Sequence, residues 1–214
     1  SQQTEPFLHI DGDVFIWKKF DESLVESALI AQNKESATSF YENIMLLLEA
    51  NLKYFPKEII EERCNKQLIY AYNAGIFGGN DITFFQQYCK KAFDFVNSNL
   101  NNLYKINVGY FNIFFEQYFF YCLAKKENKK VNVLFNNLID DTQYMGFGDF
   151  LEVPYLKQYL HLLGNYKKSS RVCHQLANRL REDYPEYYYR IIYLYKSRDL
   201  PLLKDYYYFL NQLT

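Results

Sequence analysis

The chain has 214 residues, of which 49% are hydrophobic and 20% aromatic, and its formal net charge at pH 7 is −1. This balance excludes a disordered chain and a nucleic-acid partner bound through net positive charge. We expect neither a transmembrane segment nor a signal peptide, because no apolar run is long enough to span a bilayer. The four cysteines are widely spaced, which indicates reduced thiols in a cytoplasmic protein.

The first eighty residues alternate short apolar runs with turn residues, a pattern typical of a strand-rich core. Residues 36–39 offer an N-cap for an amphipathic helix that runs towards Leu52, with Ile44, Leu47 and Leu48 on its apolar face. The predicted strands are 6–10, 13–17, 28–31 and 67–72.

From residue 81 onwards the pattern is mainly helical. Asn80 or Asp81 caps a helix that ends near Asn97, and Pro185 interrupts the helical C-terminal part. We therefore expect one α/β domain over residues 1–214, strand-rich at 1–80 and helix-rich at 81–214. The other predicted elements are helices at 108–124, 168–184, 186–196 and 202–213 and a strand at 130–135.

Asp11-Gly12-Asp13 follows the first predicted strand. Two carboxylates one residue apart diverge on a continuous strand, but they can converge on one hard cation where the strand breaks into a turn. The glycine between them allows the backbone to approach a ligand. An ordinary acidic turn between two strands has the same sequence, so the pair alone does not decide between the two interpretations.

A second segment, Asn73-Ala74-Gly75, ends the strand predicted at 67–72. Its amide group and free backbone N–H groups can bind sugar hydroxyls or phosphate. An ordinary glycine-rich turn from a strand to a helix is the structural alternative.

A third segment begins at His161, which closes the apolar stretch 155–160. A neutral imidazole can bind a metal ion. Gly164 allows close approach to a phosphate, and Lys167 can neutralise its charge. A hydrogen-bonded histidine in the core is the alternative.

Four short motifs occur along the chain in an order that resembles a known family. The order is that of retaining GT-A glycosyltransferases of the glycogenin and bacterial lipopolysaccharide galactosyltransferase kind. The resemblance touches nearly the whole chain, but only through these motifs. They are Asp11-x-Asp13, Asn73-x-Gly75, Glu116-Gln117 and His161-x-x-Gly164-x-x-Lys167.

The resemblance implies a metal centre. In that family the Asp-x-Asp pair and the motif histidine hold Mn²⁺, which binds the diphosphate of a nucleotide sugar. Carried over to this chain, Mn²⁺ (or Mg²⁺) would be held by Asp11, Asp13 and His161, while Gly164 and Lys167 would contact the phosphates. The three metal ligands must then lie within a few ångströms of one another in the folded protein.

The same resemblance implies a substrate site. Asn73, Ala74 and Gly75 would line the donor sugar, and Glu116 or Gln117 would orient or stabilise the reacting face.

The sequence also departs from the family pattern. Glu116 stands where the family usually has Asp, and Lys168-Ser169 replaces a common Pro-Trp. Only ten residues precede Asp11, where the family has about a hundred that form a Rossmann-like half. We expect a GT-A-like mixed sheet with an incomplete nucleotide-binding half and a helix-rich C-terminal part, active in its intact form rather than as the isolated chain.

The resulting hypothesis is a metal-dependent glycosyltransferase domain of bacterial polysaccharide assembly. It would transfer sugar from a nucleotide-sugar donor to a glycan or lipid-linked acceptor, in the cytoplasm or at the inner face of the membrane. One alternative is a non-catalytic binding domain of the same shape. The other is a haloacid-dehalogenase-type phosphatase, in which Lys130, Asp140 and Asp141 would join the Asp-x-Asp pair; Phe15 stands where that family has Thr or Val.

Overall fold

The chain forms two compact units. The first comprises residues 1–147 and 159–161, and the second comprises 148–158 and 162–214. The sequence, by comparison, predicted one domain over residues 1–214. The computed structural model describes residues 3–16, 19, 26–37, 39–64, 69–139, 159–162 and 169–198.

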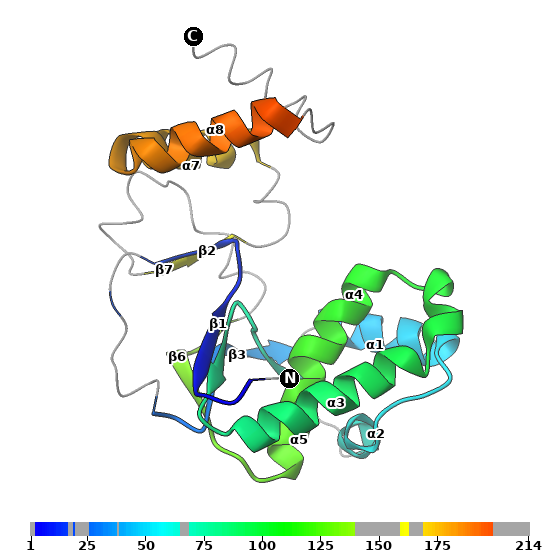
Figure 1. Cartoon of the computed structure of the whole chain (residues 1–214). Helices are drawn as coiled ribbons and strands as arrows, with labels where there is room; N and C mark the ends of the chain where they lie inside the picture. Colours follow the sequence, from blue (N-terminus) through cyan, green and yellow to red (C-terminus); the bar gives the residue numbers. More distant parts are fainter. Residues whose placement is uncertain are drawn as a thin grey trace. The chain divides into compact units, whose positions relative to one another are not determined.

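The first unit is an α/β structure with a mixed sheet (Figure 1). Its strands are β1 (Phe7–Ile10), β2 (Val14–Ile16), β3 (Leu29–Ala37), β4 (Ile69–Tyr72), β5 (Ile76–Gly79), β6 (Val131–Ile139) and β7 (Tyr159–His161). The main sheet has the order β1-β5-β3-β4, and β6 pairs with the other edge of β3. Only the β3–β6 pair is parallel among the described pairs, and β2 and β7 form a separate antiparallel pair.

Strands β4 and β5 follow one another along the same edge of β3, with an interruption between them. At the interruption, Asn73 keeps its place in the ladder: its N–H donates to the Asn33 carbonyl (3.0 Å), and its carbonyl accepts from the Gln32 N–H (3.2 Å). Residues 74–75 leave the ladder as an outward turn, as extra residues do in a β-bulge. The sequence predicted the end of β4 but not the second strand at 76–79.

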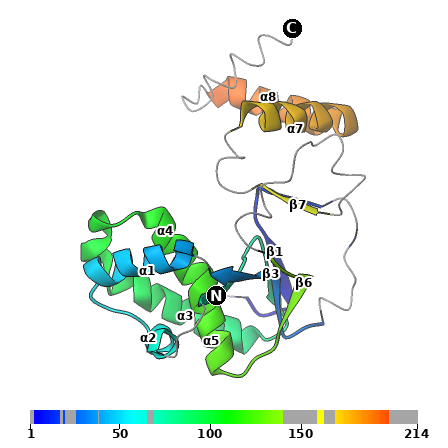
Figure 2. The ribbon, with the colours of Figure 1, turned by 180° about the vertical axis from the view of Figure 1, so that it is seen from behind.

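The helices described in the first unit cover one face of the main sheet (Figures 1 and 2). Asp81 caps the third helix by accepting from the Phe84 N–H at 3.0 Å, which confirms the predicted cap. The helix predicted at 108–124 is also present, but it contains a π-helical turn at Phe114–Tyr118. The helices are α1 (Ser39–Asn51), α2 (Lys57–Cys64), α3 (Ile82–Asn97), α4 (Val108–Ile113) and α5 (Phe119–Lys126), with a 3₁₀ turn at Leu100–Lys105.

One residue of the predicted cap and one predicted core residue of α1 differ from the prediction. Strand β3 runs to Ala37, so Ser36 pairs with Tyr70 in the sheet instead of capping the helix. In α1, Ile44 and Leu48 are buried as predicted, but Leu47 is 38% exposed. A helix repeats every 3.6 residues, and the buried stripe here passes through Tyr41, Ile44, Met45 and Leu48, which leaves Leu47 at its border.

The core beneath the helices is an aromatic cluster centred on Phe120, which is fully buried. Phe77 of β5 lies closest to it, with ring centroids 4.6 Å apart in an edge-to-face arrangement. Such pairs add about 0.5–1.5 kcal/mol each beyond the area they bury. The cluster therefore joins β4, β5, α3 and α5. The other rings around Phe120 belong to Tyr72, Phe84, Phe85 and Tyr88.

The second unit contains α7 (Ser170–Asp183) and α8 (Pro185–Arg198). These helices match those predicted at 168–184 and 186–196, and Ser169 caps α7 by accepting from the Val172 N–H. The helix predicted at 202–213 lies outside the described residues. Among the described helices, none has both the length and the apolar character needed to cross a membrane.

Replacing Phe120 should test the central place of the aromatic cluster. We expect Phe120→Ala to lower the free energy of unfolding by about 3–5 kcal/mol, because it removes a buried ring from among five others. Phe93→Ala is the matched control: its ring is 65% exposed, so we expect a change within about 0.5 kcal/mol. Urea unfolding of both variants measures the difference, and equal losses would contradict this account of the core.

Candidate metal centre and adjoining cavity

The turn between β1 and β2 carries the first two predicted ligands. The Asp11 N–H donates to the carbonyl of Gly75 (3.0 Å), and the Val14 N–H donates to the Asp11 carbonyl (3.1 Å). The chain therefore leaves the main sheet after Ile10, and both carboxylates lie on a turn. A Cβ added at Gly12 would meet nothing within 4 Å, so the protein itself does not require glycine there.

Strand β7 brings His161 to this turn. In the β2–β7 pair, His161 lies opposite Val14, the neighbour of Asp13. The His161 ring is 5% exposed, and its Nε2 lies 3.5 Å from Asp13 Oδ1. One ligand atom from each of Asp11, Asp13 and His161 lies within 4.8 Å of the others. The three residues predicted as ligands thus converge although most of the chain separates them.

Neighbouring amides fix the orientation of the His161 ring. Asn33 donates its Nδ2 hydrogen to the Lys34 carbonyl (3.3 Å), so its Oδ1 accepts from Gln32 Nε2 (3.0 Å). Gln32 Oε1 then lies 2.8 Å from His161 Nδ1. A carbonyl oxygen can only accept, so Nδ1 of the neutral ring carries the hydrogen. Nε2 therefore presents its lone pair to Asp13, the arrangement in which imidazole binds a metal.

Gly75 makes room for the His161–Gln32 pair. A Cβ at this position would lie 2.3 Å from Gln32 Oε1 and 2.4 Å from His161 Nδ1, too close for either atom to stay in place. The family resemblance implied that Gly75 lies beside a donor sugar. In the structure its carbonyl accepts from the Asp11 N–H and its lack of a side chain accommodates the histidine ring, so it helps to position Asp11 and His161.

Asn73 and Gln117 belong to a buried hydrogen-bond network. Asn73 is 2% exposed; its Oδ1 accepts from the Gly75 N–H (2.9 Å), and its Nδ2 donates to Glu35 (2.8 Å). The Tyr41 hydroxyl joins Glu35 to Gln117, with oxygen separations of 3.1 and 2.6 Å. This network supports the interruption between β4 and β5. Ala74, the middle residue of the motif, lines the neighbouring cavity.

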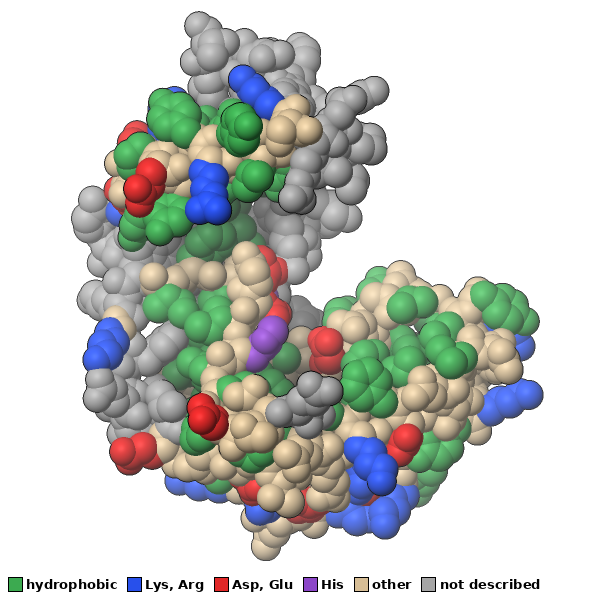
Figure 3. All heavy atoms as spheres, viewed as in Figure 1, with side chains coloured by type: hydrophobic (Ala, Val, Ile, Leu, Met, Phe, Trp, Pro, Cys, Tyr) green, Lys and Arg blue, Asp and Glu red, His purple; other side chains and the backbone are tan. Residues whose placement is uncertain are grey.

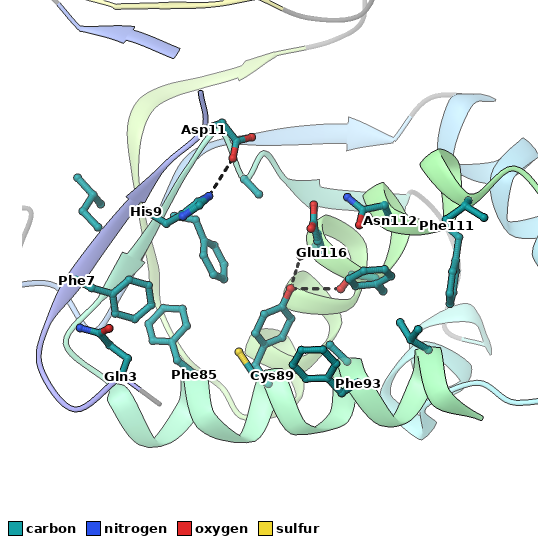
Figure 4. Close-up of a pocket in the computed structure, with 18 of the residues that line it drawn as sticks. Gln3, Phe7, His9, Asp11, Phe85, Cys89, Phe93, Phe111, Asn112 and Glu116 are labelled. Atoms are coloured by element: carbon teal, nitrogen blue, oxygen red, sulfur yellow. Dashed lines mark hydrogen bonds and ion pairs between the residues drawn. The ribbon is translucent and has the colours of Figure 1, made fainter. Parts of the chain in front are cut away.

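Glu116 lines the same cavity as Asp11 and Ala74 (Figure 4). It lies in the π-helical turn, where the Tyr88 hydroxyl donates to its backbone carbonyl at 3.0 Å. Burial raises the pKa of the Glu116 carboxyl, and the negative charge of Asp11 raises it further, against a hydrogen bond from Asn112 and the influence of His9. Single π-turns within α-helices frequently mark functional sites.

A family comparison covers most of the chain. The sequence model that matches residues 1–194 is described as a family of unknown function, DUF6734. The chain belongs to the DUF6734 family. Neither a curated protein nor a solved structure matches it.

Three residues at the site of this DUF6734 member were not singled out from the sequence. His9 lies two residues before Asp11, and its Nε2 is 3.0 Å from Asp11 Oδ1. The period of two along a strand could have indicated this pair. Gln32 follows directly on the apolar run 28–31, where a polar residue signals a buried partner. Asn112 precedes Glu116 by one helical turn, a spacing at which side chains meet.

Several predicted residues lie outside the described part of the structure. They include Gly164 and Lys167 of the third motif, and Asp140 and Asp141 of the phosphatase alternative. Lys130 is exposed and lines a second cavity of about 430 Å³, which is not the cavity that Asp11 lines.

The raised pKa of Glu116 predicts a pH-dependent gain in stability for Glu116→Gln. The folded chain holds this proton to higher pH than the unfolded chain, so stability falls as pH rises between the two pKa values and stays lower above both. We expect Glu116→Gln to unfold at a higher temperature at neutral pH, with the gain vanishing below about pH 4, where unfolded Glu is protonated. Glu5→Gln, at an exposed position, is the control. Thermal unfolding of the variants and the unmodified chain at several pH values measures this gain. A gain in unfolding temperature that does not depend on pH would contradict the electrostatic cause.

The orientation of Gln32 predicts the tautomer of His161. At a pH where the ring is neutral, long-range proton–nitrogen NMR spectra should show hydrogen on Nδ1 and a lone pair on Nε2. Gln32→Leu removes the acceptor at nearly constant volume, and the spectrum should then move towards a mixture of tautomers. The exposed His9 serves as reference in the same spectra. A ring protonated on Nε2 in the unmodified protein would overturn the assignment.

Proposed function

We propose that this DUF6734 member contributes the catalytic part of a metal-dependent glycosyltransferase. It would transfer sugar from a nucleotide-sugar donor to a glycan or lipid-linked acceptor. The observation that carries the proposal is the convergence of Asp11, Asp13 and His161. These are the residues that the resemblance to retaining GT-A glycosyltransferases assigns to one cation.

The converging groups suit a divalent cation. Two carboxylate oxygens and one imidazole nitrogen match Mn²⁺ or Mg²⁺, and the nitrogen favours Mn²⁺. Opposite ligands on an ion with bonds of about 2.2 Å lie about 4.4 Å apart, close to the 4.8 Å within which the three atoms fall. Gln32 holds the histidine by its other nitrogen, as supporting residues of metal sites usually do.

The chemistry of transfer assigns a role to each part of the site. The acceptor oxygen forms a bond to the anomeric carbon while the bond from that carbon to the diphosphate breaks. The electron pair leaves with the diphosphate, which also takes the acceptor's proton. A bound cation stabilises the charge on this leaving group. Asp11 and Asp13 would hold the cation in this position. Glu116 faces the cavity from which an acceptor can approach.

Other features support the same proposal. A mixed sheet with helices on one face is compatible with an α/β fold of the GT-A kind. Gly164 and Lys167 are proposed as phosphate contacts by the resemblance alone. A cytoplasmic or inner-membrane-face location and a part in bacterial polysaccharide assembly belong to the proposal in the same way.

Metal binding tests the proposal directly. We expect Mn²⁺ to bind the unmodified chain and raise its unfolding temperature, since a ligand at a hundred times its Kd stabilises by about 2.7 kcal/mol. Asp13→Asn and His161→Ala should each weaken Mn²⁺ binding at least about tenfold. Asp94→Asn, which removes an exposed carboxylate from α3, should leave it unchanged. Titration calorimetry and thermal unfolding measure both effects.

The outcome separates the proposal from its main rival. A non-catalytic domain of the same shape would keep the network around Asn73 and Gln117 but would gain no stability from Mn²⁺. If the two site variants bind Mn²⁺ as well as Asp94→Asn does, the metal centre and the glycosyltransferase proposal both fail.

A further inference from the structure

A cavity of about 830 Å³ lies in the first unit beside the candidate metal centre (Figure 4). Strands β1 and β5 form one side, and α3, α4 and the π-helical turn form the other. Its size falls within the roughly 300–1,000 Å³ typical of small-molecule sites. The lining is mainly aromatic and aliphatic, and includes Phe7, Phe77, Phe85, Ala92, Phe111 and Phe115.

Apart from Gln3, which lies beside Phe7, the charged and amide-bearing side chains of the cavity gather near the metal centre. His9, Asp11, Asn112 and Glu116 lie there, as Figure 4 shows. Among the described residues that line the cavity, none is Lys or Arg. Two carboxyl groups without a lining cation disfavour an anionic ligand, because like charges repel across a partly desolvated space. The polar end instead suits a hydroxyl-bearing group, which can donate to a carboxylate and accept from an amide.

The apolar rim of the cavity is exposed to water. Phe93 and Val108 both line it, and they are 65% and 56% exposed. The space-filling view shows hydrophobic side chains gathered over the helices, with a histidine and acidic side chains at the edge of the hollow beside them (Figure 3). Burying apolar surface is favourable because it removes that surface from water. A ligand with an apolar part would cover this rim and fill the aromatic interior.

We propose that this cavity binds an uncharged amphiphile, with its hydroxyl-bearing head at Asp11 and Glu116 and its aliphatic or aromatic tail along the phenylalanine wall. As the acceptor, such a molecule would place a hydroxyl beside the metal centre; this role rests on the proposed function. The preference for an uncharged amphiphile rests only on the lining and the charges of the cavity.

The test uses an uncharged apolar fluorophore, N-phenylnaphthylamine, without metal or nucleotide sugar. The fluorophore should bind the whole chain and be displaced by octyl glucoside below its micelle concentration, but not by glucose or octyl sulfate. Cys89 lines the cavity from α3, so Cys89→Phe should fill it and weaken fluorophore binding at least about tenfold. Lys90→Phe adds the same ring at the next, exposed position of α3 and should leave binding unchanged.

Thiol modification provides a second measurement that needs no variant. Octyl glucoside should slow alkylation of Cys89 in the unmodified chain, while the exposed Cys64 serves as internal reference. Mass spectrometry of the peptides separates the two sites.

Several results would overturn the inference. They are absence of fluorophore binding, equal effects of Cys89→Phe and Lys90→Phe, equal displacement by octyl sulfate, and unchanged alkylation of Cys89. The experiment needs no metal, so it is independent of the Mn²⁺ titration. If the chain does not bind Mn²⁺ but still binds the amphiphile, the inference about the ligand of the cavity stands. Only the role of the cavity as an acceptor site is then lost.

Discussion

The candidate site depends on one constraint, the interruption between β4 and β5. A continuous strand would leave no outward turn at residues 74–75, and the carbonyl of Gly75 could not hold the Asp11 N–H. A side chain at that position would collide with Gln32 and His161. Within the interruption, the Asn73 side chain accepts a hydrogen bond from the Gly75 N–H and so stabilises the turn. The backbone geometry of residues 73–75 thus helps to fix where Asp11 and the His161 imidazole lie relative to one another.

Charge at the site differs from charge elsewhere on the first unit. Several other carboxylates of the unit are paired with lysines, such as Glu58 with Lys91 at 2.7 Å and Asp81 with Lys129 at 2.6 Å. Asp11 and Glu116 instead face one cavity, and the charge of Asp11 helps to raise the Glu116 pKa. Carboxylates that share a partly buried space oppose each other's ionisation, and a cation offsets that repulsion. A net charge of −1 for the whole chain conceals this local excess.

Much of the fold could be predicted from the sequence, because local signals and tertiary packing agree there. The Asp81 cap and the helix from Val108 are examples. The extension of β3 to Ala37 could not be predicted, because buried polar residues such as Gln32 interrupt its apolar pattern and find partners only in the folded chain. The π-helical turn likewise has no local signal. For the site, the motifs indicated the converging residues, but the supporting roles of Gln32 and Gly75 arise from contacts between distant segments.

The short β2–β7 pair has a consequence for how the site forms and opens. It joins segments separated by more than half of the chain through only three residue pairs, and closing so long a loop costs entropy before those contacts can repay it. The aromatic cluster around Phe120 involves no residue of either strand. Local unfolding of β7, which would also break the His161–Gln32 hydrogen bond, would therefore leave that cluster intact. A ligand bound by both Asp13 and His161 would stabilise the paired state of β2 and β7. Occupancy of the site and local order in β7 would therefore increase and decrease together.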